Sequence, residues 1–421
     1  MIHKHILPNG LRVLTVPLTD HKTVTVLVLV GIGARDESKK QNGISHFLEH
    51  MCFKGTKKRP TAFDISRELD GLGAQSNAFT SYEYTGYYAK SHYKHLPFLL
   101  DVVSDIYQNS TLPDEEIQKE KGVVIEEINM YNDRPEYIAG KVMSELLYGD
   151  TPFGRSIAGD RDTVTAITQK SLAQYKKEHY NSSNTVVVIS GKVDGTDTLT
   201  LVKNAFANIE QGLPEDRTLS RMAKREARVE ITFKESDQAH MVLGLPGYDV
   251  FHKDKTILSV LSALLGGGMS SRLFQKIREE MGVAYYIYCH ATSSTDSGDF
   301  QVAAGVDKNR VLEVCEAIQS ELQKLISEEV DEDELAKVKE YLIGNMYLDL
   351  ESSDAYAYYY GIKEVMRRPL EAPTETEKRI RAVTKEDIYR VANDLFAGAQ
   401  LKMSIVGPFK SLPGVEKTLL L

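Results

Sequence analysis

Two histidines stand four residues apart in the stretch GISHFLEHMCFKGT, residues 43–56, and a glutamate directly precedes the second one. On a helix, His46 and His50 lie one turn apart on the same face, with Glu49 beside them. Imidazole nitrogens at this spacing can bind one Zn²⁺, and the glutamate is then placed to take a proton from a water molecule that the metal activates. The order H-x-x-E-H is the inverzincin motif. The stretch therefore predicts a catalytic zinc site.

A pair of core histidines without a metal is the alternative interpretation of this stretch. Apolar residues occupy nearly every side of the predicted helix: Ile44, Phe47, Leu48, Met51 and Phe53. Such a helix is expected to be buried. Two histidines and a glutamate inside a buried helix need partners, and a metal ion supplies them. We therefore favour the metal site.

A catalytic zinc ion of this type takes a third protein ligand and leaves a fourth position for water. The candidate segment is EEIQKEKGVVIEEINMY, residues 115–131. A helical projection gives it one apolar stripe, formed by Ile117, Val124, Ile128 and Tyr131. Glu120 and Glu127 lie at the edge of that stripe, whereas Glu126 points to the opposite side, as expected for a solvated acidic face. We predict Glu127 as the third ligand and Glu120 as a partner that orients a ligating histidine.

Length and composition limit what kind of protein carries these residues. A chain of 421 residues is long enough for two or three domains, and 42% apolar with 26% charged residues is typical of a globular protein. The formal net charge is -9, and the chain has no long basic run. Nucleic acid is therefore an unfavoured partner, whereas a neutral or basic peptide would not be repelled.

The compartment is predicted from three further features. The N-terminal stretch MIHKHILPNGLRVL has no signal-peptide character, and the apolar run at 26–30 is too short to cross a membrane and predicts a buried strand. The three cysteines, Cys52, Cys289 and Cys315, are too few to form a disulfide framework. We expect a cytoplasmic protein that does not enter the membrane.

An internal duplication organises the chain. ITQKSLAQYKKEHY followed by NTVVVISG, within 167–191, matches VTKEDIYRVANDLF followed by LKMSIVG, within 383–407, at one constant offset. DEEIQKEK at 114–121 matches EDELAKVK at 332–339 at nearly the same offset. Each half alternates strand-like apolar runs with long helical stretches, which predicts two homologous α+β halves. Their expected boundaries are 1–212, a linker at 213–228, and 229–421.

The sequence resembles the pitrilysin (insulysin) family of zinc metallopeptidases, which includes the mitochondrial processing peptidase, and above all the short bacterial processing-peptidase-like members. The resemblance covers essentially the whole chain. It rests on PNGLRV, GISHFLEHMCFKGT, SNAFTSYEYTGYYAK, EKGVVIEEINMY and REEMGVAYYIY. It implies two halves that face each other as a clamshell, each a mainly antiparallel sheet covered by helices. It also implies one Zn²⁺ per chain on the N-terminal half.

For individual residues, the resemblance implies His46, His50 and Glu127 as ligands and Glu49 as the general base. SNAFTSYEYT matches the family's edge strand, which pairs with the substrate as an added β-strand, so Asn77 and Ala78 are implied substrate contacts.

In the C-terminal half, the resemblance implies that Arg278 and Tyr285 reach the substrate. A cation and a phenol are suitable donors to the oxyanion of the reaction. At the offset of the duplication, the histidine motif falls on ALLGGG, 263–268, and Glu127 falls within 343–345, where no residue is acidic. The second copy is therefore not expected to bind zinc.

The sequence thus predicts a zinc-dependent metalloendopeptidase that cuts extended peptides or unfolded segments and that forms a homodimer. The alternative is a non-hydrolytic, peptide-binding or scaffolding subunit of the same family. A nucleotide-binding enzyme is the least favoured class, because the glycine-rich run LLGGGMSSRLF at 264–274 lacks the G-K-[ST] ending of a phosphate-binding loop.

Overall fold

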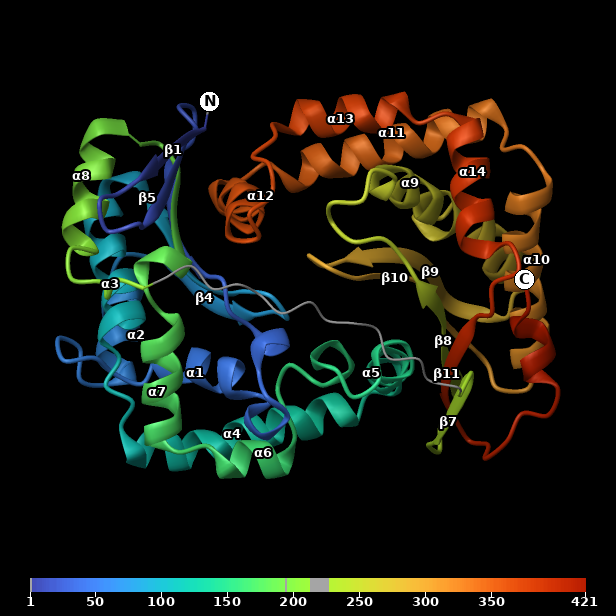
Figure 1. The fold of residues 1–421 in the computed structure, drawn as a ribbon, viewed down its shortest axis with the longest axis horizontal. Helices are drawn as coiled ribbons and strands as arrows, with labels where there is room; N and C mark the ends of the chain where they lie inside the picture. The colour runs from blue at the N-terminus through green and yellow to red at the C-terminus, as the bar shows by residue number, and fades with distance from the viewer. Residues whose placement is uncertain (1, 194, 213–226) are drawn as a thin grey trace. The chain divides into compact units, whose positions relative to one another are not determined.

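Two β-sheets, one of six strands and one of five, organise the fold (Figure 1). The computed structural model describes residues 2–193, 195–212 and 227–421. They form two compact units, each assembled from three segments of the chain. Unit 1 comprises Met1–Ile128, Ser156–Thr218 and Leu348–Leu370, and unit 2 comprises Asn129–Arg155, Leu219–Tyr347 and Glu371–Leu421.

The six-stranded sheet of unit 1 has the order β1-β2-β6-β3-β5-β4. Its neighbouring strands are antiparallel except for the parallel pair β2 and β6. The strands are β1 His3–Ile6, β2 Arg12–Pro17, β3 Thr23–Val30, β4 Gln75–Thr80, β5 Thr85–His92 and β6 Thr185–Gly191. The helices that begin in this unit are α1 Ile44–Cys52, α2 Ala62–Gly71, α3 Leu96–Asn109, α4 Asp114–Asn132, α6 Arg161–Ala166, α7 Gln169–His179, α8 Gly195–Ala205 and α12 Ser353–Val365.

Strand β3 is apolar from Val26 to Val30 because both faces of the sheet are covered there. Val26 and Val28 belong to one apolar core with residues of α1, α3 and α7. Leu27 and Leu29 point to the other face, where α12 packs. Their methyl groups lie so close to Gly361 of α12 that a Cβ there would come within 2.7 Å of Leu29. The apolar run at 26–30 predicted a buried strand, and the structure has one there.

The five-stranded sheet of unit 2 has the order β7-β11-β8-β10-β9, with only β7 and β11 parallel. The strands are β7 Val229–Phe233, β8 Gln238–Pro246, β9 Ala284–Ser293, β10 Gly298–Asp307 and β11 Lys402–Gly407. The helices that begin in this unit are α5 Pro135–Tyr148, α9 Lys255–Gly266, α10 Val311–Ser327, α11 Glu332–Asp349, α13 Pro373–Ala382 and α14 Lys385–Phe396, together with a π-helical segment at Phe274–Glu280.

The predicted duplication is visible in the two sheets. Helix α7 leads into β6, which pairs in parallel with β2 and antiparallel with β3. Helix α14 leads into β11, which pairs in parallel with β7 and antiparallel with β8. The side chains of Thr168 and Thr384 cap the two helices by accepting bonds from Ser171 N and Asp387 N. The expected α+β fold class with two homologous, mainly antiparallel halves is confirmed.

Each unit also contains one helix from the other half of the sequence. Helix α5 packs on β8 and β11 of unit 2, and α12 packs on β3 and β6 of unit 1. The predicted halves, 1–212 and 229–421, follow the sequence and include no such exchange. Of the predicted linker 213–228, all but residues 227 and 228 lies outside the described residues.

The structure also describes the three cysteines and the helices on which the expectations about disulfide bonds and membranes depend. Cys52, Cys289 and Cys315 are all buried and free of disulfide bonds. Among the described residues, no helix has the length and apolar character that crossing a membrane would require.

Candidate metal centre

Helix α1 is fixed at its start by a carboxylate and a glycine. Gly43, with φ +95°, precedes the helix in a left-handed conformation, and a Cβ there would lie 2.7 Å from Ala158 O. The buried carboxylate of Glu37 accepts hydrogen bonds from the N–H groups of Gly43 at 2.7 Å and Ser45 at 2.8 Å. Because the first N–H groups of a helix have no partner within it, Glu37 stabilises the start of α1.

The interior face of α1 buries Ile44, Phe47, Leu48 and Met51 in the core of unit 1. His46 and His50 lie on one face, with their ring centroids 4.6 Å apart. Helix α4 supplies Glu127, whose Oε2 is 3.6 Å from Nε2 of each histidine. The structure thus brings Glu127, and not the exposed Glu126, to the two histidines.

The donor set fits Zn²⁺. Two imidazole nitrogens and a carboxylate oxygen lie within 4.8 Å of one another. A tetrahedral zinc ion with bonds of about 2.0–2.2 Å places neighbouring ligand atoms roughly 3.3 Å apart, close to the 3.6 Å that separates Glu127 Oε2 from each Nε2. Within the described part of the chain, this is the one group of three or more such side chains that could hold a metal ion.

Glu120 is not among the three converging groups but stands behind one of them. Its Oε1 lies 2.8 Å from Nδ1 of His50, and its Oε2 lies 2.5 Å from Nζ of Lys54. A carboxylate on Nδ1 fixes the tautomer that leaves Nε2 with its lone pair. The geometry is that of a partner that orients a ligating histidine.

Glu49 projects from α1 next to the two histidines and is 9% exposed. Its Oε2 accepts a hydrogen bond from the hydroxyl of Thr80, the last residue of β4, at 2.5 Å. Burial raises the pKa of Glu49, and Glu127 adds to the rise, whereas Thr80 and His50 oppose it. A buried carboxylate with a raised pKa is suited to accept a proton.

The two histidines differ in their electrostatic surroundings. Burial and the neighbouring His50 lower the pKa of His46 to about 4, which keeps its imidazole neutral near pH 7. Burial also acts to lower the pKa of His50, but the hydrogen bond to Glu120 and the charges of Glu49 and Glu127 outweigh it, so the pKa is raised. A histidine binds a metal ion through its neutral imidazole, and the lowered pKa of His46 meets this condition.

The predicted substrate contacts lie on the edge strand β4. Asn77 and Ala78 pair on one side with Tyr88 and Tyr87 of β5, and no other described strand pairs with β4. The side chain of Asn77 is used locally, because its Oδ1 accepts the N–H of Ala78 at 2.9 Å. An added strand that pairs through this N–H would have to displace the Asn77 amide.

Arg278 and Tyr285 lie near each other in unit 2. Arg278 belongs to the π-helical segment, and its Cζ is 6.0 Å from the ring centroid of Tyr285 and 5.0 Å from that of Phe274. Tyr285 is on the edge strand β9 and is 71% exposed, which leaves its phenol available to another molecule.

Two residues that contact the candidate site were not predicted from the sequence, Thr80 and Lys54. Both lie within stretches already singled out, SNAFTSYEYT and GISHFLEHMCFKGT. The signal for Thr80 was its place two residues after Ala78, which puts both on the same face of a strand. Lys54 follows the end of α1 and gave no signal of its own.

Comparison with known proteins places this chain in a peptidase family. The sequence model of the insulinase family, peptidase family M16, matches residues 12–161, and that of the peptidase M16 inactive domain matches residues 166–342. The first match contains His46, Glu49, His50 and Glu127, and the second contains Arg278 and Tyr285.

Curated relatives and solved structures agree with these matches. A protein of Streptomyces coelicolor named an uncharacterized zinc protease is 34% identical over 97% of this chain and 90% of its own length. The uncharacterized zinc protease YmxG of Bacillus subtilis is 34% identical over 98% of this chain and 100% of its own length. The crystal structure of a protease from Helicobacter pylori has a TM-score of 0.90 at 26% identity, covering 97% of this chain and 99% of that one.

Proposed function

The chain belongs to the insulinase family of peptidases, family M16, and from this membership and the metal centre we propose that it is a zinc-dependent metalloendopeptidase acting on extended peptides or unfolded segments. The resemblance noted in the sequence is thereby confirmed at the level of the family. One observation carries the proposal: Nε2 of His46, Nε2 of His50 and Oε2 of Glu127 converge on one point beside the carboxylate of Glu49.

The proposed roles follow from the chemistry of each group. Zn²⁺, when held by His46, His50 and Glu127, supplies Lewis acidity that polarises the scissile carbonyl and activates water. Glu49 takes the proton of the attacking water and passes it to the leaving amine. Thr80 keeps Glu49 in the orientation that this transfer needs, through the hydrogen bond to Oε2.

Two pairs of residues outside the ligand set are proposed to bind the substrate. The free edge of β4 at Asn77 and Ala78 pairs with an extended segment of the substrate, which gives affinity through main-chain hydrogen bonds and little dependence on sequence. Arg278 and Tyr285 donate hydrogen bonds to the oxyanion that develops at the attacked carbonyl. Both pairs of residues are proposed on the resemblance, and the exposure of Tyr285 and of the β4 edge is consistent with these roles.

Metal analysis combined with a peptide digest tests the proposal. The purified protein should contain one Zn²⁺ per chain and should cut a defined mixture of unstructured peptides, with the cuts identified by mass spectrometry. A chelator should abolish cleavage, and added Zn²⁺ should restore it. A protein that binds zinc and peptides without cutting them would support instead the non-hydrolytic subunit of the same family.

We further propose a homodimer in the cytoplasm, active without any different chain. Because one chain carries both the ligand set and the Arg278–Tyr285 pair, no second gene product is needed for catalysis. Mixing Glu49→Gln with Tyr285→Phe chains tests the assembly. Activity recovered after exchange of subunits shows that the two sets act between chains, whereas no recovery places both sets in the same chain.

A further inference from the structure

Lys54 holds one end of the carboxylate whose other end orients a metal ligand. Its Nζ lies 2.5 Å from Oε2 of Glu120, and the Oε1 of the same carboxylate lies 2.8 Å from Nδ1 of His50. Glu120 is 3% exposed, so these two side chains take the place of water around it. Both come from one short segment, the end of α1 and the second residue after it.

A buried carboxylate needs partners for both of its oxygens. Leaving one oxygen of a buried charge without a partner costs free energy, and the group then turns toward any other donor within reach. With Lys54 on Oε2, the carboxylate of Glu120 cannot turn without losing an ion pair. Its Oε1 therefore stays on Nδ1 of His50, and the imidazole keeps its Nε2 directed at Glu127.

The backbone that carries Lys54 is fixed immediately after it. Gly55 has φ +132°, a conformation that favours glycine, and a Cβ there would lie 2.3 Å from Pro60 O. The carbonyl of Gly55 accepts a hydrogen bond from Thr111 N at 3.0 Å. Lys54 therefore extends from a segment that is tied to the chain beyond α3, and its ammonium is directed at Glu120.

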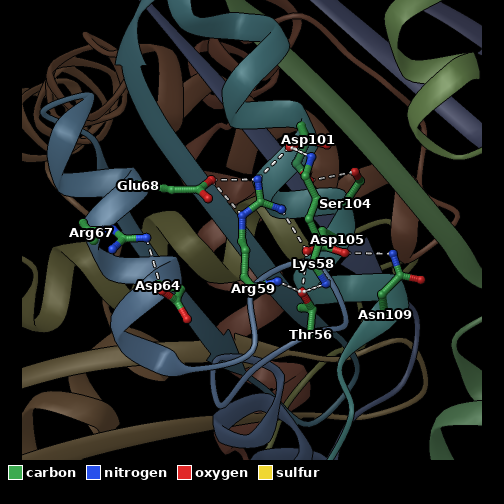
Figure 2. A network of polar contacts seen from close by, with 10 residues as sticks. All are labelled: Thr56, Lys58, Arg59, Asp64, Arg67, Glu68, Asp101, Ser104, Asp105 and Asn109. Atoms are coloured by element: carbon green, nitrogen blue, oxygen red, sulfur yellow. Dashed lines mark hydrogen bonds and ion pairs between the residues drawn. The ribbon is translucent and has the colours of Figure 1, made fainter.

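An ionic network around the buried Arg59 anchors the same segment farther along (Figure 2). Thr56 Oγ1 donates to Asp105 Oδ2 at 2.6 Å, and the guanidinium of Arg59 donates to the same oxygen at 2.8 Å. Arg59 also binds Asp101 at 2.6 Å and Glu68 at 2.8 Å. The segment after α1 is thereby attached to both α3 and α2.

We propose that Lys54 is a positioning residue for the metal centre, which acts through Glu120 to hold His50 in its ligating orientation and thereby raises the affinity of the site for Zn²⁺. This inference rests on the proposed function, because it requires that the site binds zinc. Lys54 itself does not touch the metal position. It binds Glu120, and Glu120 in turn binds His50.

The zinc dissociation constant of Lys54→Met, measured by competition with a chromogenic chelator, tests this directly. We expect it to rise about tenfold, at the lower end of the effect of removing an outer partner of a metal ligand. Lys54→Arg should restore most of the affinity, since a cation returns to Oε2 of Glu120. Lys57→Met, an equal loss of charge at an exposed position of the same segment, should leave the constant unchanged. If the methionine variant does not fold, Lys54→Gln takes its place in each measurement.

A double-mutant cycle separates positioning from a merely structural role. In the background of Glu120→Gln, the substitution of Lys54 should change the zinc dissociation constant by less than about twofold, because the group through which it acts is gone. The same tenfold loss in both backgrounds would overturn the proposal, as would an unchanged constant in Lys54→Met alone. Wild-type protein that binds no zinc would overturn the proposed function as well, so the two failures are distinguishable.

Discussion

The hydroxyl of Thr80 donates a hydrogen bond to Oε2 of Glu49 at 2.5 Å, and so connects the end of strand β4 to the helix that carries the two proposed histidine ligands. The contact joins the edge proposed to bind substrate with the group proposed to move the proton. We expect Glu49, which Thr80 holds, to keep its orientation when a substrate segment pairs with β4.

Thr80→Val should lower kcat/KM about tenfold, the effect of removing one hydrogen bond to a charged group. Valine has the shape of threonine without the hydroxyl, so packing is retained while Glu49 loses its donor. Zinc content should not change, and Thr80→Ser should regain most of the activity. A valine variant with the kinetics of the wild type would show that Thr80 does not orient the base.

Glu49→Gln should keep its zinc and lose hydrolysis by a factor of about 10²–10⁴, the usual contribution of a general base. The amide cannot take a proton, while His46, His50 and Glu127 remain as ligands. Metal analysis and peptide cleavage are measured on the same preparation. Turnover near the wild-type rate in a zinc-loaded Gln variant would remove Glu49 from the role of base.

Glu127→Gln should weaken zinc retention, because a neutral amide replaces the charged ligand that lies 3.6 Å from both Nε2 atoms. Glu126→Gln is the matched control, since Glu126 is the adjacent residue on the exposed side of α4. Zinc is measured after dialysis. The opposite order of the two variants would mean that Glu127 is not a ligand.

Glu37 predicts a pH dependence of stability. Burial raises its pKa to about 7, although bonds from Ser45, Asn42 and Gly43 oppose the rise, whereas an unfolded glutamate titrates near 4.5. The folded state therefore keeps a proton that the unfolded state loses, and this stabilisation is lost as the pH rises through about 7. The difference in free energy of unfolding between wild type and Glu37→Gln should fall by about 3 kcal/mol from pH 4.5 to 8. Urea unfolding at a series of pH values measures it, and a constant difference would contradict the shift.

Arg59→Met should destabilise the protein by about 3–5 kcal/mol, because it leaves the buried carboxylate of Asp105 without its cation. Arg67→Met is the matched control, since Arg67 pairs with Asp64 at the surface, and should cost less than about 0.5 kcal/mol (Figure 2). Both values come from urea unfolding of the zinc-free protein. Equal costs for the two variants would show that the network around Arg59 contributes little to stability.

The amino-acid sequence by itself determined what depends on the local geometry of helices and strands. The spacing of His46 and His50 places them on one helical face whatever the rest of the chain does, and the same periodicity separates Glu127 from Glu126. The repeated helix-strand segments predicted two α+β halves with a common plan. The placement of the histidines and of Glu127 rests on the 3.6-residue period of the helix, which the backbone sets, and the prediction of two halves rests on the internal repeat of the sequence.

Only the tertiary structure decided which elements meet. The contacts of Glu49 with Thr80 and of Glu120 with Lys54 depend on how β4 and α4 pack against α1, and no local period encodes that. The exchange of α5 and α12 between the two units is likewise a property of packing, because each helix covers strands that lie far from it in the chain. Which sheet a helix covers depends on how particular side chains fit together, such as Leu27 and Leu29 against Gly361. These residues lie far apart in the chain.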